Sequence, residues 1–102
     1  MSYSEYEMKV IQWSEARKII PNSTALAQLQ KIEEEVNELR DGITSNNREE
    51  IIDGVGDCTV VLINICALLD INLTDCLAHA YEQIKNRKGY MNEQGLFIKE
   101  TV

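Results

Sequence analysis

The stretch Lys31–Arg40, KIEEEVNELR, places four glutamates within a few residues of one another: Glu33, Glu34, Glu35 and Glu38. It lies in a segment whose apolar residues recur in steps of three and four, which predicts a helix over residues 24–41. In that helix Glu35 and Glu38 lie one turn apart, point to the same side and border the apolar stripe. Like charges at this spacing destabilise an isolated helix by about 0.2–0.5 kcal/mol, so the pair is either solvated or holds a cation.

The next segment, residues 47–69, is apolar on nearly every side, which predicts a central helix surrounded by others. Asp53 and Asp57 lie four residues apart in it and share a face. The short loop between the two predicted helices favours an antiparallel pair, in which Glu38 lies near Asp53 and Glu35 opposite Asp57. Four carboxylates then converge, and oxygen ligands without His or Cys suit Mg²⁺ or Mn²⁺ better than zinc.

An ion-pair network is the alternative explanation of these acids, with Lys31, Arg40 and Arg48 as partners. The position of Asp53 and Asp57 deep in apolar sequence favours the metal site, because unpaired carboxylates are rarely placed there.

The whole chain reads as one domain, residues 1–102, with an all-α fold. The pattern predicts a four-helix bundle whose helices cover residues 4–20, 24–41, 47–69 and 74–88. A short tail over residues 90–102 holds a turn and a short alternating piece. Gly54 and Gly56 each cost a helix about 1 kcal/mol, which indicates close approach of another helix or a ligand.

Composition excludes some classes of function. The chain is 44% hydrophobic and 26% charged, as globular proteins are, and its formal net charge of −7 argues against binding a nucleic acid polymer. The first ten residues do not resemble a signal peptide, and the apolar run Val60–Leu69 is too short to cross a membrane. Cys58, Cys66 and Cys76 lack metal-site spacing and indicate core thiols, so we expect a cytoplasmic protein.

The basic cluster Lys85-Asn86-Arg87-Lys88 follows the last predicted helix. It is explained equally well as cations at a helix C-terminus and as a phosphate clamp that faces the metal. Trp13 would suit stacking on a base, although a single tryptophan on an amphipathic helix more often belongs to the core.

The acidic motifs resemble the MazG-like family of all-α nucleoside triphosphate pyrophosphohydrolases over about residues 10–90. Glu34-Glu35-Val36-Asn37-Glu38 matches the EExxE motif of that family. Asp53-Gly54-Val55-Gly56-Asp57 stands where EELGD is usual, so Asp57 matches the aspartate of ExxD while Gly54 replaces its glutamate. Asp53 is the substitute ligand that we expect. Asn86 to Tyr90 is similar to the basic and aromatic residues that follow the last helix in this family.

The resemblance implies hydrolysis of a (d)NTP to a (d)NMP and pyrophosphate, with Mg²⁺ or Mn²⁺ as the cofactor. The residues that it implies as metal ligands are Glu35, Glu38, Asp53 and Asp57. Glu34 or Glu35 would accept the proton of the attacking water. The substrate-binding candidates are Lys31, Asn86, Arg87, Lys88 and Trp13. A homodimer or homotetramer is expected, without a membrane partner. The alternatives are a non-catalytic acidic helical oligomer that binds nucleotide or a protein partner, and a plain structural dimer.

Overall fold

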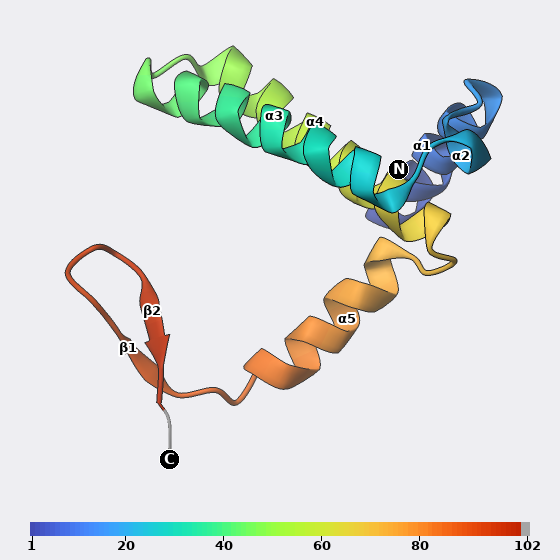
Figure 1. Cartoon of the computed structure of the whole chain (residues 1–102). Helices are drawn as coiled ribbons and strands as arrows, with labels where there is room; N and C mark the ends of the chain where they lie inside the picture. Colours follow the sequence, from blue (N-terminus) through green and yellow to red (C-terminus); the bar gives the residue numbers. More distant parts are fainter. Residues whose placement is uncertain (101–102) are drawn as a thin grey trace.

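The structure, a computed structural model that describes residues 1–100, consists of helices and one small hairpin (Figure 1). The bounds of the elements are α1 Tyr3–Ala16, α2 Ile19–Asn22, α3 Ala25–Thr44, α4 Arg48–Leu68, α5 Leu73–Ile84, β1 Gly89–Met91 and β2 Phe97–Lys99. The predicted all-α fold is confirmed, because the hairpin is the only sheet among the described residues.

The antiparallel pair α3–α4 forms the centre of the fold (Figure 1). The Asn64 side chain on α4 donates a hydrogen bond of 3.4 Å to Gln28 on α3, near one end of the pair. Gly54 lies against Leu39 farther along it. The start of α3 thus contacts the end of α4, and the end of α3 contacts the start of α4. This is the antiparallel arrangement that a short connecting loop predicts.

Gly54 is the closest point of this contact. An ideal Cβ at Gly54 would lie 3.0 Å from Cβ and 3.1 Å from Cα of Leu39, whereas a Cβ at Gly56 would meet nothing within 4 Å. The expectation of a close helix approach therefore applies to Gly54 and not to Gly56.

This difference predicts opposite effects of the same substitution. Gly54→Ala should lower the free energy of unfolding by about 1–2 kcal/mol, because the overpacking cost exceeds the gain in helix propensity. Gly56→Ala should raise it by up to about 1 kcal/mol. Urea unfolding of both variants at one protein concentration measures the difference, and equal stabilities would show that Gly54 is not a packing position.

Helix boundaries differ from the prediction at the N-terminal end. The helix expected over residues 4–20 ends at Ala16, where Lys18 takes a left-handed conformation with φ 63°. The chain then turns into the short α2, which packs against α4.

Two further boundaries differ from the prediction. α3 does not end at Asp41-Gly42 but continues to Thr44, because Gly42 is buried in the helix and faces Glu50 of α4. α5 ends at Ile84 rather than at residue 88, so the predicted basic cluster lies in the link to the hairpin. The predicted turn of the tail joins β1 to β2, where Met91 pairs with Phe97.

A small core lies where α1 crosses the second half of α4. Its buried apolar residues all come from α4: Val61, Ile63 and Cys66. The fully buried hydroxyl of Ser14 on α1 donates a hydrogen bond of 2.6 Å to Asn64. Cys58, Cys66 and Cys76 are free thiols. Burial is the largest cause that raises the pKa of Cys66 to about 11, and the neighbouring Cys76 is the second cause. That thiol is therefore protonated and unreactive at neutral pH.

α5 is fixed at its N-terminal end by Glu7 of α1. The buried Glu7 carboxylate accepts hydrogen bonds from the backbone N–H of Leu73 at 2.7 Å and from the Thr74 hydroxyl at 2.5 Å. Beyond this anchor, α5 and the hairpin extend away from the other helices (Figure 1).

In length and composition α4 is apolar enough to cross a membrane. The core helices of soluble proteins pass the same test. Only 28% of the most apolar 18-residue segment of α4 is buried. The exposed apolar side chains of α4 therefore need cover from another surface.

Candidate metal centre

Three carboxylates from α3 and α4 come together at the centre of the helix pair. Glu35 and Glu38 on α3 and Asp57 on α4 each offer an oxygen atom, and these atoms lie within 4.8 Å of one another. Two of the three sit one turn apart on α3, and the antiparallel pairing brings the third to the same level. Such a group of oxygen ligands suits a hard divalent cation.

Glu35 is the buried member of this cluster. Its residue is 6% exposed, and its Oε1 atom pairs with the Lys31 ammonium at 3.4 Å. Its Oε2 atom is buried without a hydrogen-bond partner among the described residues. A buried carboxylate oxygen without a partner is costly, and a cation at the cluster would satisfy it. The residues present therefore fit a divalent cation.

Repulsion inside the cluster perturbs Glu38. The negative charge of Glu35 is the largest cause that raises the pKa of Glu38, with desolvation second, and Lys31 opposes the shift only in part. A raised pKa means that folding favours the protonated form of Glu38. Its contribution to stability is full below the ordinary glutamate pKa and is lost as the pH rises through the folded-state pKa.

The metal-free protein should therefore gain stability when this charge is removed. We expect Glu38→Gln to melt at a higher temperature than the wild type at pH 7.5 in EDTA, with the difference disappearing near pH 4. In Mg²⁺ the order should reverse, because only the wild type gains stability by binding the cation. Thermal melts across pH, with and without Mg²⁺, test this, and a lower melting temperature of the variant in EDTA would contradict it.

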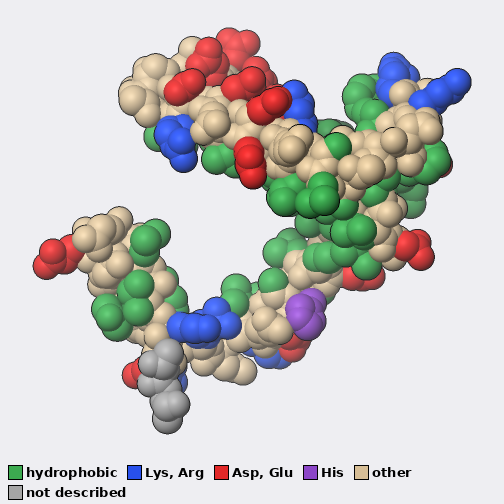
Figure 2. Space-filling model, in the orientation of Figure 1, with side chains coloured by type: hydrophobic (Ala, Val, Ile, Leu, Met, Phe, Trp, Pro, Cys, Tyr) green, Lys and Arg blue, Asp and Glu red, His purple; other side chains and the backbone are tan. Residues whose placement is uncertain are grey.

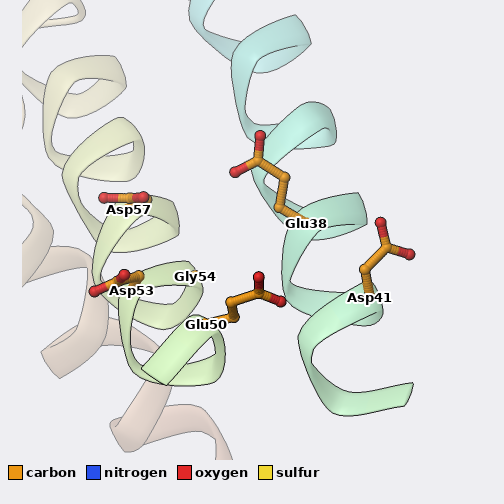
Figure 3. Close-up of a pocket in the computed structure, with 6 residues that line it drawn as sticks. All are labelled: Glu38, Asp41, Glu50, Asp53, Gly54 and Asp57. Atoms are coloured by element: carbon orange, nitrogen blue, oxygen red, sulfur yellow. The ribbon is translucent and has the colours of Figure 1, made fainter. Parts of the chain in front are cut away.

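Asp53 lies outside the three-residue cluster. It lines a neighbouring acidic groove of about 340 Å³ whose wall is formed by Glu38, Asp41, Glu50, Asp53, Gly54 and Asp57. Figure 3 shows Glu38 directed from α3 toward Asp57, whereas Asp53 is turned away from Glu38. The structure thus brings together three of the four predicted carboxylates, and the role of Asp53 as the fourth ligand stays a prediction, since Asp53 lines the same groove as Glu38 and Asp57.

The predicted ion-pair network is only partly present. Lys31 contacts Glu34 at 3.3 Å and Glu35 at 3.4 Å. Arg40 donates instead to the side chain of Asn37, and within residues 1–100 Arg48 forms no ion pair. Most of the acids of α3 and α4 therefore lack a basic partner.

A second groove, of about 480 Å³, begins at the carboxylate cluster and runs toward α1. Lys31, Glu35 and Asp57 line one part of it, and Trp13 lines another. Half-exposed Trp13 carries the Arg17 guanidinium 5.4 Å from its ring centroid. The volume is in the range of small-molecule sites.

Polar groups that the sequence prediction did not single out line this groove. Asn64 is 4% exposed, accepts from Ser14 and donates to Gln28, which donates in turn to Ser23 at 3.1 Å. The signal for Asn64 was present in the sequence, since it is the polar interruption of the apolar run Val60–Leu69.

The family model of the MazG nucleotide pyrophosphohydrolase domain matches residues 23–91, which is more than half of the chain. The chain belongs to the MazG family. The match includes α3, α4, α5 and β1, and it leaves α1 with Trp13 outside.

A curated relative of this MazG protein is the "Uncharacterized 18.2 kDa protein in rep-hol intergenic region" of Haemophilus phage HP1 (strain HP1c1). It is 40% identical over 52 residues, which cover 51% of this chain and 32% of the relative. The match thus spans about a third of the relative's length. No solved structure is significantly similar to the chain.

The predicted basic cluster after α5 of this MazG chain lies apart from the carboxylates. Asn86, Arg87 and Lys88 line a separate groove of about 380 Å³ together with Lys99 of the hairpin. Figure 2 shows acidic side chains gathered on the α3–α4 pair and basic ones at the end of α5 beside the hairpin. Lys31 and Trp13 are therefore the predicted substrate-binding residues that lie beside the cluster within one chain.

Proposed function

We propose that this protein is a Mg²⁺-dependent pyrophosphohydrolase that converts a (d)NTP to the (d)NMP and pyrophosphate. One observation carries the proposal: the unpartnered oxygen of Glu35 lies in a carboxylate cluster that opens into a groove of ligand size. Membership of the MazG nucleotide pyrophosphohydrolase family supports the reaction class.

Glu35, Glu38 and Asp57 would hold the cation, with Mn²⁺ as an alternative to Mg²⁺. A bound Mg²⁺ would supply charge neutralisation for the phosphate oxygens and polarise the phosphorus that reacts. Asp53 borders the adjacent groove and would orient water there rather than bind the first ion.

Glu35 is our candidate for the group that accepts the proton of the attacking water. Its Oε2 atom is buried at the cluster and is not engaged by another protein group among residues 1–100. Glu34 is 67% exposed in its side chain and pairs with Lys31, so it would position that lysine instead. Lys31 would lie where a phosphate oxygen approaches the cluster, because its ammonium lies between Glu34 and Glu35.

The base would occupy the other part of the groove. Trp13 offers a half-exposed ring for stacking, and Asn64 and Gln28 offer amide groups for hydrogen bonds to the edge of a base. The hydrogen bond between these two amides is long, at 3.4 Å, so either could exchange it for a base at low cost.

A panel of the common dNTPs and NTPs, incubated with the protein in Mg²⁺ or in EDTA, tests the proposal. We expect pyrophosphate release from at least one nucleotide in Mg²⁺ and none in EDTA. Folded protein that releases no pyrophosphate from any nucleotide would refute it. Calorimetric binding of a nucleotide without turnover would favour the non-catalytic alternative.

A further inference from the structure

Asn64 is a buried amide in the wall of the groove beside the carboxylate cluster. It is 4% exposed, and it lines the groove of about 480 Å³ that also contains Glu35 and Trp13. An amide buried in the apolar run of α4 is costly unless its donors and acceptors find partners. A ligand that fills this groove from the cluster to Trp13 therefore has the Asn64 amide beside it.

The Ser14 hydroxyl determines which end of the Asn64 amide faces the groove. Ser14 is fully buried, and its oxygen lies 2.6 Å from the Asn64 side chain. That length is typical of an O–H···O bond and is shorter than N–H···O bonds, so the atom of Asn64 that faces Ser14 is its oxygen. Within residues 1–100 the groove is lined by Gln28, which faces the Nδ2 atom of Asn64, and not by Ser14. The groove side of Asn64 therefore carries its N–H donors.

Gln28 places an acceptor beside this donor. Its Nε2 atom donates to the Ser23 hydroxyl at 3.1 Å, and its Oε1 atom faces Asn64. The bond between the two amides is 3.4 Å long, beyond the usual range of N–H···O bonds, so a ligand can replace it. The groove thus offers a ligand one donor on the buried Asn64 and one acceptor on the half-buried Gln28.

A carbonyl next to a ring N–H is the base edge that complements this pair. Uracil, thymine and guanine present such an edge, whereas cytosine and adenine present an amino group next to a ring nitrogen that lacks a proton. The exocyclic group extends farther from the ring than the ring nitrogen does, so it reaches the more deeply buried Asn64. An amino group there would direct donors at donors and leave buried polar groups without partners.

We propose that Asn64 selects nucleotides whose base presents an exocyclic carbonyl, and that Ser14 is the positioning residue that holds the Asn64 amide in the orientation required. This selection rests on the proposed function, since it concerns the base of a nucleotide whose triphosphate lies at the cluster. Trp13 and Ser14 are consecutive on α1, so one helix supplies both the stacking ring and the positioning hydroxyl. Both residues lie outside residues 23–91, so the match to the family model assigns them no role.

Steady-state kinetics with dUTP and dCTP tests the selection in the wild-type protein. The two nucleotides have bases of the same size and differ only in the edge that Asn64 and Gln28 contact. In Mg²⁺ we expect kcat/KM to be at least about tenfold higher for dUTP, because dCTP leaves buried polar groups unpaired. Equal values, or a higher value for dCTP, would overturn the proposal.

Three variants separate positioning of the amide from packing of the helices. Ser14→Ala lets the Asn64 amide turn over and should bring the ratio of the two kcat/KM values close to unity. Asn64→Asp replaces the N–H donors by a carboxylate oxygen and should reverse the preference toward dCTP. As the control, Ser45→Ala removes a hydroxyl between α3 and α4 that donates to the backbone of Asp41 at 2.8 Å, so it should keep the wild-type ratio. A less stable Ser14 variant with the wild-type ratio would show that Ser14 only packs α1 against α4.

Binding without turnover separates a failure of this proposal from a failure of the proposed function. The α,β-imido analogues of dUTP and dCTP carry nitrogen in place of the bridging oxygen and resist cleavage there. Trp13 is the single tryptophan of the chain and lines the groove, so its fluorescence reports their binding in Mg²⁺. Tighter binding of the uracil analogue, without hydrolysis of dUTP, would support the role of Asn64 and refute the pyrophosphohydrolase. Hydrolysis of dUTP with equal binding of the two analogues would overturn the role of Asn64 alone.

Discussion

Replacing Glu35 by glutamine should reduce Mg²⁺-dependent pyrophosphate release at least about 100-fold, the size of effect seen when one preorganised hydrogen-bond donor is removed from a catalytic site. Glu35 is the buried carboxylate of the cluster, and one of its oxygens has no protein partner. A glutamine of nearly the same shape keeps the packing but directs a neutral amide at the cation. The side chain of Lys31 would also lose a charged partner at 3.4 Å.

Two controls separate chemistry from folding. Glu33→Gln changes an exposed glutamate of the same helix that lies outside the cluster, so it should retain nearly the full rate. Glu35→Gln itself should melt no lower than the wild type in EDTA, because it removes an unsatisfied buried charge. Equal rates for the Glu33 and Glu35 variants would show that the site is assigned to the wrong residues.

Replacing Glu7 by alanine should have the largest effect on stability, a loss of about 2–3 kcal/mol. Its carboxylate accepts two short hydrogen bonds; bonds to a charged group contribute about 1.5–3 kcal/mol each when both partners are buried, and less here because Leu73 and Thr74 are only partly buried. The alanine variant leaves the N–H of Leu73 and the hydroxyl of Thr74 without their acceptor. It also releases the first turn of α5 from α1.

Glu15→Ala is the matched control, because Glu15 is an exposed glutamate of the same helix and should change stability by less than about 0.5 kcal/mol. Urea unfolding at one fixed protein concentration compares the two variants, since association contributes to apparent stability. Hydrogen exchange should show the amides of α5 losing protection first. A Glu7 variant as stable as the Glu15 variant would contradict the anchoring role.

The sequence pattern predicted the helices and the pairing of α3 with α4 because both follow from local periodicity and a short loop. It also predicted that Glu35, Glu38 and Asp57 meet, which is the part of the site that the register of one helix pair determines. Asp53 could not be placed in the same way. Asp53 is exposed and lines the adjacent groove, and residue spacing along a helix does not determine the direction of an exposed side chain.

The sequence pattern could not predict polar contacts between residues that are far apart in the chain. Glu7 lies near the start of α1, yet its partners lie on α5, more than 60 residues away. Ser14 gave no signal at all, although it is the most deeply buried side chain and bonds to Asn64. Such contacts are selected by the tertiary arrangement, which no local rule encodes.

The most direct test of the central claim is the identity of the products. A ³¹P NMR time course of a substrate nucleoside triphosphate with the wild-type protein in Mg²⁺ should show pyrophosphate and the monophosphate rising together as the triphosphate disappears, and no change in EDTA. Release of orthophosphate with formation of the diphosphate, or unchanged substrate while Mg²⁺ raises the melting temperature, would contradict the account of this carboxylate cluster as a pyrophosphohydrolase centre.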